Sequence, residues 1–416
     1  MSAGKNVVEM SSAEQEHALE IARELAPEFK RVGAEADKKN AFPFELVSLY
    51  KDSGLVGLAV PKEYGGMGGD VWTTTRVSRE LSRLGDPACA LAFNMHQVMV
   101  GIFRGILPDD VKAKIFPEIA VQKKIVCGPF SEERAGFAGL ADTTAVPNAD
   151  GSWKINGRKF WGTLCEAADI VSFNATVTDD EGALPEDFRE HAAKQMVFIL
   201  PMTTPGIRIE RTWDALGMRA TGTHSVIFED VVAPEEARVA EFIGLYGEFE
   251  WHTMTFCGVY QGLIDKAYEE TREILKEKSL GATMEGADIV LKDIGHIQVG
   301  LGKMKVDQEV SARTIEMTCK MLLEGRDVDL DPQERIAWLD VPKVICTETA
   351  VWLTYDGMRL IGGSTFRRGH VLERLYRDSR SGPFHPLTTD QVYTHYGRFG
   401  LGLMEEPAEV EPAPAG

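Results

Sequence analysis

The chain has 416 residues, which is more than one hydrophobic core usually holds and predicts two or three domains. Apolar residues make up 44% and charged residues 26%, as in an ordinary soluble globular protein. The formal net charge of −19 argues against nucleic acid and against an anionic membrane as partners, since no basic run offsets it.

Six cysteines are spread singly along the chain, and no Cys-x-x-Cys pair occurs. This pattern predicts neither a zinc site nor a disulfide framework, and it favours buried, reduced thiols in a cytoplasmic protein. The N-terminus has no continuous apolar segment, and the sequence has no apolar run long enough for a membrane helix. We therefore expect no signal peptide and no membrane span.

The first part of the chain has helical periodicity. A capping-box pattern begins at Ser11, and a glycine-rich loop at residues 65–69 lacks the Gly-Lys-Ser/Thr ending of a phosphate loop. The helix at residues 88–105 is apolar nearly all round, which predicts burial. It carries His96, whose commoner role in such a place is that of a core histidine. Helices are expected at residues 12–36, 44–53, 71–84, 87–105 and 109–120.

Residues 125–235 have the composition of strands instead. A turn pattern at residues 148–151 (Asn-Ala-Asp-Gly) predicts a hairpin, and the polar segment 178–194 predicts a surface excursion between strands. Strand faces must be covered, so we expect the helical parts to pack on this block. The seams between the parts are where a ligand would bind.

Helical periodicity returns after the strand block, with breaks at Gly281 and at residues 327–331. The Pro/Glu/Ala-rich tail, residues 404–416, is predicted to be disordered. Helices are expected at residues 249–278, 285–325, 331–356, 370–378 and 388–403. The predicted fold class is α+β, mainly α, with an N-terminal helical domain (1–124), a middle β-barrel or β-sandwich domain (125–236) and a C-terminal four-helix bundle (237–403).

Five motifs in this order resemble the acyl-CoA dehydrogenase superfamily of flavoproteins, over about residues 12–403. Each motif is weak alone, but five in the family's order and at about its spacing are specific. They are Val60-Pro61-Lys62-Glu63-Tyr64-Gly65-Gly66, Phe130-Ser131-Glu132, Lys159-Phe160-Trp161-Gly162-Thr163, the pair of segments 216–223 and 226–231, and Ile361-Gly362-Gly363 with Leu372-Glu373-Arg374 and Arg377-Asp378.

The resemblance implies FAD, bound between the middle domain and the bundle of a homotetramer built as a dimer of dimers. Trp161 would cover the apolar end of the isoalloxazine ring, and the hydroxyl of Thr163 would lie near flavin N5. Ser131 would serve the pyrimidine end, where negative charge collects on reduction. The residues expected to bind the cofactor are Phe130, Ser131, Trp161, Thr163, Gly362, Gly363 and Thr388.

The sequence departs from the family at the catalytic base. The family removes hydrogens from Cα and Cβ of an acyl-CoA thioester with a glutamate base, and the commonest position of that glutamate is Pro386 here, next to His385. A second position used in the family falls on Trp251, one residue from Glu250. One residue turns a helix position by about 100°, so Glu250 reaches a flavin only if the register differs.

Three functions follow. The first is dehydrogenation of a CoA or acyl-carrier thioester by a relocated base, Glu250 or His385, with an electron-acceptor flavoprotein as partner. The second is a two-component monooxygenase that resembles the sulfur oxygenases of this fold, receives reduced flavin from a reductase, and uses His385 and His96 because imidazole titrates near neutral pH. The third is a non-catalytic subunit of a hetero-oligomer, which loss of the base would suit.

Overall fold

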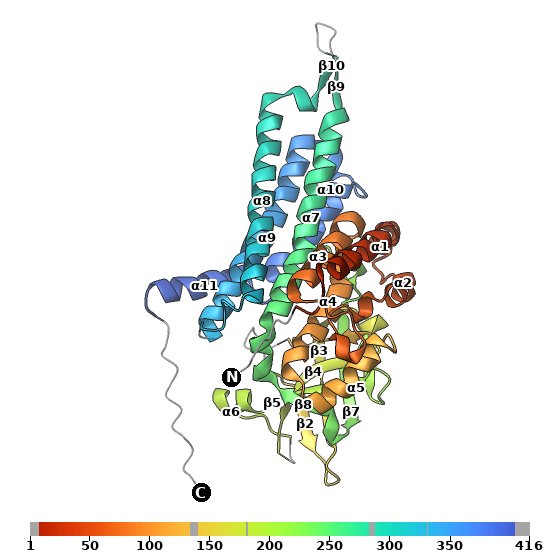
Figure 1. The fold of residues 1–416 in the computed structure, drawn as a ribbon, viewed down its shortest axis with the longest axis vertical. Coiled ribbons are helices and arrows are strands. Elements are labelled where there is room, and N and C mark those ends of the chain that lie inside the picture. Colours follow the sequence, from red (N-terminus) through yellow and green to blue (C-terminus); the bar gives the residue numbers. More distant parts are fainter. Residues whose placement is uncertain (1–7, 134–139, 180–181, 283–287, 331, 404–416) are drawn as a thin grey trace.

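The structure is a computed structural model that describes residues 8–133, 140–179, 182–282, 288–330 and 332–403 (Figure 1). Helices precede and follow one central sheet, so the predicted fold class is confirmed. The tail predicted to be disordered lies outside the described residues. Within the described ranges, every helix is too short or too polar to cross a membrane.

The N-terminal helices begin at recognisable caps. At the start of α1, the Glu14 N–H donates to Ser11 Oγ (3.3 Å) and the Ser11 N–H donates back to Glu14 Oε2 (2.7 Å), which is the predicted capping box. The helices are α1 (Ser12–Lys39), α2 (Glu45–Ser53), α3 (Val71–Glu80), which continues into the π-helical turn η3 (Leu81–Gly85), α4 (Pro87–Ile106) and α5 (Asp109–Ala120). As predicted, α4 is buried along most of its length.

The middle of the chain forms one eight-stranded mixed sheet with the path β6-β7-β3-β2-β4-β5-β8, and β1 pairs with β4 off this path. The predicted hairpin joins β2 to β3, where the Gly151 N–H donates to the Asn148 carbonyl oxygen (3.0 Å). The strands are β1 (Val126–Cys127), β2 (Thr144–Pro147), β3 (Trp153–Gly162), β4 (Ile170–Val177), β5 (Gln195–Pro201), β6 (Ile207–Glu210), β7 (His224–Ala233) and β8 (Arg238–Glu241). Over the described residues β6 and β8 do not pair, so the sheet is open and not a closed barrel.

The C-terminal helices form a bundle around the long helix α7 (Figure 1). Its members are α7 (Phe249–Glu277), α8 (Gly295–Leu323), α9 (Pro332–Ile361) and α10 (Val371–Ser379), and α11 (Thr389–Gly400) projects beside them. The predicted helix start at residue 285 is wrong, because a hairpin of β9 (Ser279–Ala282) and β10 (Asp288–Val290) precedes α8. Gly281 has φ +88°, and the β-branched Ile289 and Val290 favour extended backbone.

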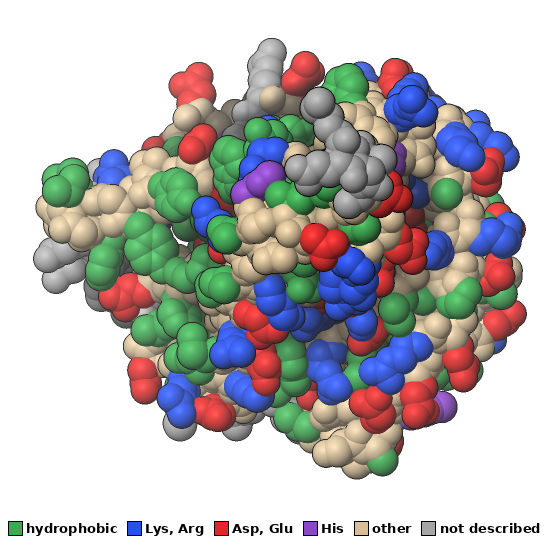
Figure 2. Space-filling model, turned by 90° about the horizontal axis from the view of Figure 1, so that it is seen from above, with side chains coloured by type: hydrophobic (Ala, Val, Ile, Leu, Met, Phe, Trp, Pro, Cys, Tyr) green, Lys and Arg blue, Asp and Glu red, His purple; other side chains and the backbone are tan. Residues whose placement is uncertain are grey.

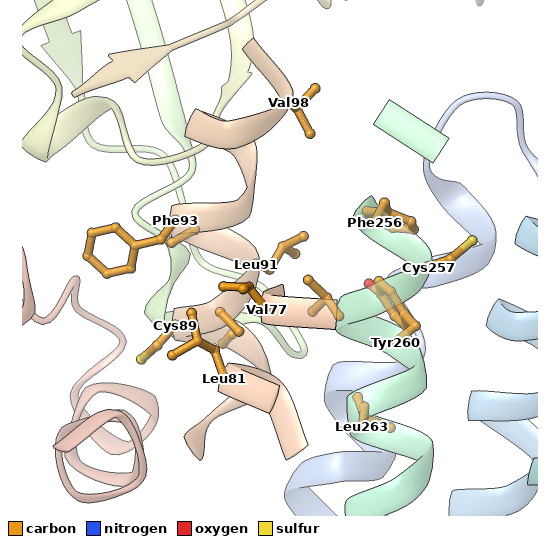
Figure 3. Packing of buried hydrophobic residues seen from close by; sticks show 14 of the residues in the cluster. Val77, Leu81, Cys89, Leu91, Phe93, Val98, Phe256, Cys257, Tyr260 and Leu263 are labelled. Carbon is orange, nitrogen blue, oxygen red and sulfur yellow. The ribbon is translucent and has the colours of Figure 1, made fainter. Parts of the chain in front are cut away.

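The hydrophobic core joins the two helical parts. Figure 3 shows Val77, Leu81 and Leu91 of the N-terminal part facing Phe256 and Tyr260 of α7. One continuous cluster of buried residues runs from α1 to α10, whereas a second cluster lies within the sheet around Phe173, Phe198 and Phe228. The N-terminal helices and the bundle therefore form one packed body, and the sheet has a core of its own.

Arg377 and Asp378 of the C-terminal family motif form an ionic junction between the bundle, the N-terminal helices and the sheet-containing middle part. Both Nη atoms of Arg377 donate to the carboxylate of Asp37 in α1 (2.9 and 2.8 Å), and Nη1 also donates to the Leu216 carbonyl oxygen (3.1 Å). The next residue, Asp378, accepts the N–H of Met218 (2.6 Å) and is fully buried. Two consecutive residues thus connect α10 to α1 and to the loop before β7.

Replacing Arg377 with alanine is expected to cost about 3 kcal/mol of unfolding free energy, because Asp37 then stays buried without its bidentate partner. The measurement is the shift of the urea unfolding midpoint. As a control, Arg359→Ala removes an exposed pair with Asp356, for which we expect less than about 1 kcal/mol. Equal shifts for the two variants would contradict a structural role of the junction.

Candidate functional site

The predicted flavin contacts Trp161 and Ser131 lie at one end of β3. The Phe160 N–H donates to the Ser131 carbonyl oxygen (2.8 Å), which places Ser131 beside the residue before Trp161. The Trp161 indole is 61% exposed, and its ring meets Trp213 edge-on at 5.6 Å. A large apolar ring left this exposed within the chain fits a planar ligand that would cover it.

Beneath this end of the strand, two motif residues form a buried ion pair. Lys159 Nζ donates to Glu132 Oε1 and to Asn174 Oδ1 (2.8 Å), and the Thr143 hydroxyl donates to the same Glu132 oxygen (2.7 Å). Lys159 is completely buried, and this burial lowers its pKa to about 8 despite the opposing carboxylate. The pair therefore joins the segment that carries Ser131 to β3, close to the candidate flavin contacts.

Thr163 belongs to a row of hydroxyl groups that reaches the ionic junction. Its Oγ1 lies 2.9 Å from Thr223 Oγ1, which lies 2.7 Å from Thr221 Oγ1, and Thr221 donates to the Met218 carbonyl oxygen (2.8 Å). Because each hydroxyl has one proton, Thr223 donates to Thr221 and Thr163 donates to Thr223. The free lone pairs of Thr163 therefore make it an acceptor, which fits an N–H group of a reduced flavin.

Two histidines and two phenylalanines stack where the bundle meets the loop after α10. Along α7, Phe249 lies 5.2 Å from His252, and His252 lies 5.8 Å from Phe256, with nearly parallel rings. From the loop, His385 packs on Phe256 at 4.2 Å. His385 was predicted from the sequence, but His252 was missed, although it directly follows the family position at Trp251.

Both imidazoles are neutral at physiological pH. Burial lowers the pKa of His252 to about 4. Burial also holds the pKa of His385 well below its usual range, and the positive charges of Lys343 and of a protonated His252 lower it further. The Nδ1 atom of His252 is buried and has no hydrogen-bond partner among the described residues. A neutral imidazole with a free nitrogen can accept or release a proton toward a bound ligand.

Glu250 has one carboxylate oxygen in an ion pair, whereas its Oε1 is buried and has no hydrogen-bond partner among the described residues. Its carboxylate is fully buried, Oε2 lies 2.7 Å from Arg335 Nη2, and Arg335 Nε lies 2.7 Å from Asp327 Oδ2. Burial raises the pKa of the Glu250 carboxyl, against the opposing charge of Arg335. The neighbouring Trp251 packs against α4. The sequence could not reveal Arg335, which lies 85 positions away.

His96 has the core role that its place in an apolar helix suggests. The Val126 N–H donates to its Nδ1 (3.0 Å), so Nε2 carries the proton and donates to the Val56 carbonyl oxygen (2.8 Å). The side chain is completely buried, and burial lowers its pKa to about 4. Both nitrogens are used by backbone groups, so His96 ties α4 to β1 and no nitrogen remains for a ligand.

This burial makes a prediction for acid stability. The folded pKa of His96, about 4, is below the ordinary 6.5, so the unfolded chain binds more protons in that range. The neutral, buried imidazole contributes its full stability above the ordinary pKa, and this stability is lost as pH falls toward 4. By about pH 5 the loss is about 2 kcal/mol of unfolding free energy. We expect His96→Gln to show a smaller drop in urea midpoint between about pH 7.5 and about pH 5. A drop equal to that of the unchanged chain would contradict this assignment.

The remaining predicted cofactor residues are Thr388, Phe130, Gly362 and Gly363. Thr388 is the N-cap of α11, where the Gln391 N–H donates to its Oγ1 (3.3 Å), and Phe130 packs 5.9 Å from Phe242. Gly362 has φ +93°, and a Cβ at Gly362 or Gly363 would meet no atom of this chain within 4 Å. The open space at both glycines is compatible with the close approach of a ligand or a second subunit, and these cofactor roles stay predictions.

The acyl-CoA dehydrogenase N-terminal, middle and C-terminal domain families match residues 12–123, 127–231 and 247–385. Bovine mitochondrial short-chain specific acyl-CoA dehydrogenase is 28% identical, covering 86% of this chain and 82% of its own (Bos taurus). L-evernosamine nitrososynthase from Micromonospora is 27% identical, covering 91% and 89%.

Among solved structures, TdsC from Paenibacillus sp. A11-2 with FMN and indole has a TM-score of 0.82 at 21% identity, covering 93% of this chain and 97% of its own. This likeness concerns the fold. Three consecutive domain families account for most of the chain. The chain therefore belongs to the acyl-CoA dehydrogenase family and is an FAD-dependent flavin oxidoreductase of that fold.

Proposed function

We propose that this chain is a two-component monooxygenase that receives reduced flavin from a reductase and uses His252 and His385 to move protons. The observation that carries the proposal is the pair of neutral histidines stacked on Phe256. Pro386, next to His385, occupies the family's base position. The other candidate base, Glu250, has one carboxylate oxygen in an ion pair with Arg335.

The bound reduced flavin would supply two electrons and activate dioxygen. One oxygen atom then goes to the substrate and the other leaves as water, which consumes two protons. A neutral imidazole suits this proton traffic, because one ring nitrogen donates while the other accepts. The rings of Phe249, Phe256 and Tyr260 pack against the two imidazoles, which are half-buried, so apolar surface replaces part of their contact with water.

Relatives of two kinds match the chain. The nitrososynthase relative matches nearly the whole chain at the sequence level. The second candidate is α,β-dehydrogenation of an acyl-CoA, which the bovine short-chain relative favours. In that case an imidazole would have to take the α-proton, with an electron-acceptor flavoprotein as partner, although the low pKa of His252 makes it a weak base.

The two candidates differ in one anaerobic experiment. The FAD-loaded protein is mixed with a panel of short- to long-chain acyl-CoA thioesters, and flavin absorbance is followed. We expect no bleaching. A parallel aerobic assay with NADH and a flavin reductase tests amino-sugar nucleotides and aromatic heterocycles, with incorporation of labelled oxygen detected by mass spectrometry. Bleaching with formation of an enoyl-CoA would overturn the proposal in favour of the dehydrogenase.

A second copy of the chain is proposed to cover the outer face of α8. Val299, Val306, Val310 and Met317 follow one another at helical spacing and are 65%, 61%, 51% and 57% exposed. On α11, Tyr393 and Phe399 are also more than half exposed. Figure 2 shows hydrophobic side chains frequent on the side where α11 projects, while charged side chains crowd the opposite side.

Replacing both Val306 and Val310 with glutamate is expected to lower the oligomeric mass, because buried carboxylates would face one another without partners. The measurement is light scattering after size-exclusion chromatography. The control is Lys305→Glu, which changes the net charge by the same amount but lies one residue, about 100° around α8, from Val306. An unchanged mass for the valine variant would contradict an interface on this face.

A further inference from the structure

A buried lysine of α9 holds the loop that carries His385. Lys343 is 1% exposed, and its Nζ donates to the carbonyl oxygens of His385 (2.9 Å) and Leu387. These two carbonyls stand on either side of Pro386, which has no N–H with which to fix the loop itself. One ammonium group therefore fixes the backbone next to the imidazole.

The charge of this lysine has a buried counterpart. Asp340 precedes it by one turn of α9 and is completely buried, and neither of its oxygens has a hydrogen-bond partner among the described residues. Burial lowers the pKa of Lys343, whereas the negative charge of Asp340 raises it. Burial raises the pKa of Asp340 to about 7, and the positive charge of Lys343 opposes this rise, so each group favours the charged form of the other.

We propose that Lys343 is a positioning residue, which fixes residues 385–387 so that the His385 ring stays packed on Phe256, and that Asp340 keeps Lys343 charged for this task. The inference rests on the proposed function only in that it links the ring position to turnover. A lysine that merely supports the fold would alter stability without acting selectively on His385.

The test is hydrogen exchange measured by mass spectrometry in the intact, FAD-loaded protein. In Lys343→Met we expect backbone amide exchange in peptides covering residues 382–388 to rise at least about tenfold, because the held loop opens more often. Exchange at the C2 position of His385 should also change, while that of His96 stays the same. Unchanged exchange at residues 382–388 and at His385 would overturn the proposal.

A matched control lies on α7. Lys266 is also a buried lysine that donates to a backbone carbonyl, that of Gly85, in another part of the molecule. Lys266→Met should leave the exchange of residues 382–388 unchanged. If Lys343→Met does not fold, Asp340→Asn provides the second variant. It keeps the lysine donors but removes their counter-charge, so a smaller change at His385 in the same direction is expected, and no change there would count against the proposal.

Turnover separates this inference from the proposed function. We expect Lys343→Met to lower kcat by about 10- to 100-fold with KM little changed, and to have no further effect in a His385→Ala background, as residues acting through one group are non-additive. If exchange shows a released loop but kcat is unchanged, Lys343 does position His385, and the proton role of His385 is what fails. Additive losses in the double variant would overturn the coupling itself.

Discussion

Replacing Lys159 with methionine is expected to lower the unfolding free energy by about 3–5 kcal/mol, the cost of breaking a buried ion pair from one side. Glu132 would keep its bonds from Thr143 but would face the sheet core without a cation. The same change should weaken FAD binding, because Ser131 and Trp161 depend on the segments that this pair joins. Urea unfolding and the flavin-to-protein absorbance ratio measure the two effects.

Lys154→Met is the matched control, since Lys154 lies on the same strand with its side chain exposed. It should shift stability by less than about 0.5 kcal/mol. The double variant Glu132→Gln with Lys159→Met removes both charges and keeps acceptors for Thr143, so part of the lost stability should return. Equal losses for Lys154→Met and Lys159→Met would show that the pair has no special role.

Replacing His385 with alanine is expected to reduce oxygenation turnover by about 10²- to 10⁴-fold, the usual contribution of general acid–base catalysis. His252→Ala should cause a loss in the same range, whereas His17→Ala, at an exposed position of α1, should cause none. FAD content should stay unchanged in all three variants. Full turnover in His385→Ala would remove the histidines from the proposed mechanism.

The pH dependence follows from the same site. The pKa of His252 is about 4, so its imidazole is neutral throughout the usual assay range and becomes protonated only toward that value. Turnover limited by this group should therefore be flat from about pH 8 down to about pH 5.5 and fall below that. A half-maximal rate near the ordinary pKa of 6.5 would show that the imidazole is more solvated than the structure indicates.

The sequence was sufficient for the fold because the family motifs are local strings in a fixed order. It was not sufficient for the roles of their residues. Arg377 pairs with Asp37, which lies 340 positions away in the sequence, and no local pattern indicates that partner. In the same way, Glu250 pairs with Arg335, which lies 85 positions away, and no local pattern indicates that partner either. His252 was missed because a histidine one residue past the expected position carries no signal until Phe256 and His385 are seen around it.

The helical periodicity also had a limit. It located α4 and α7 to within about two residues, because their apolar faces are long and regular. It failed just before α8, where β9 and β10 pair and the side chains of Ser279, Leu280 and Ile289 are exposed. Short surface strands are set by pairing with one another, as in β9 and β10, and such pairing leaves a weak trace in composition.

The two separate cores have a consequence for how the chain folds. The helical body is assembled from two stretches of chain, and the entire sheet lies between them in sequence. Its central packing of α4 on α7 must therefore close a very long loop, which is entropically unfavourable and slow. The sheet begins with a tight β2–β3 hairpin and completes its own core from neighbouring segments. Early formation of the sheet would bring the ends of α5 and α7 together, so the part that carries the candidate flavin contacts would also act as the template on which the helical body assembles.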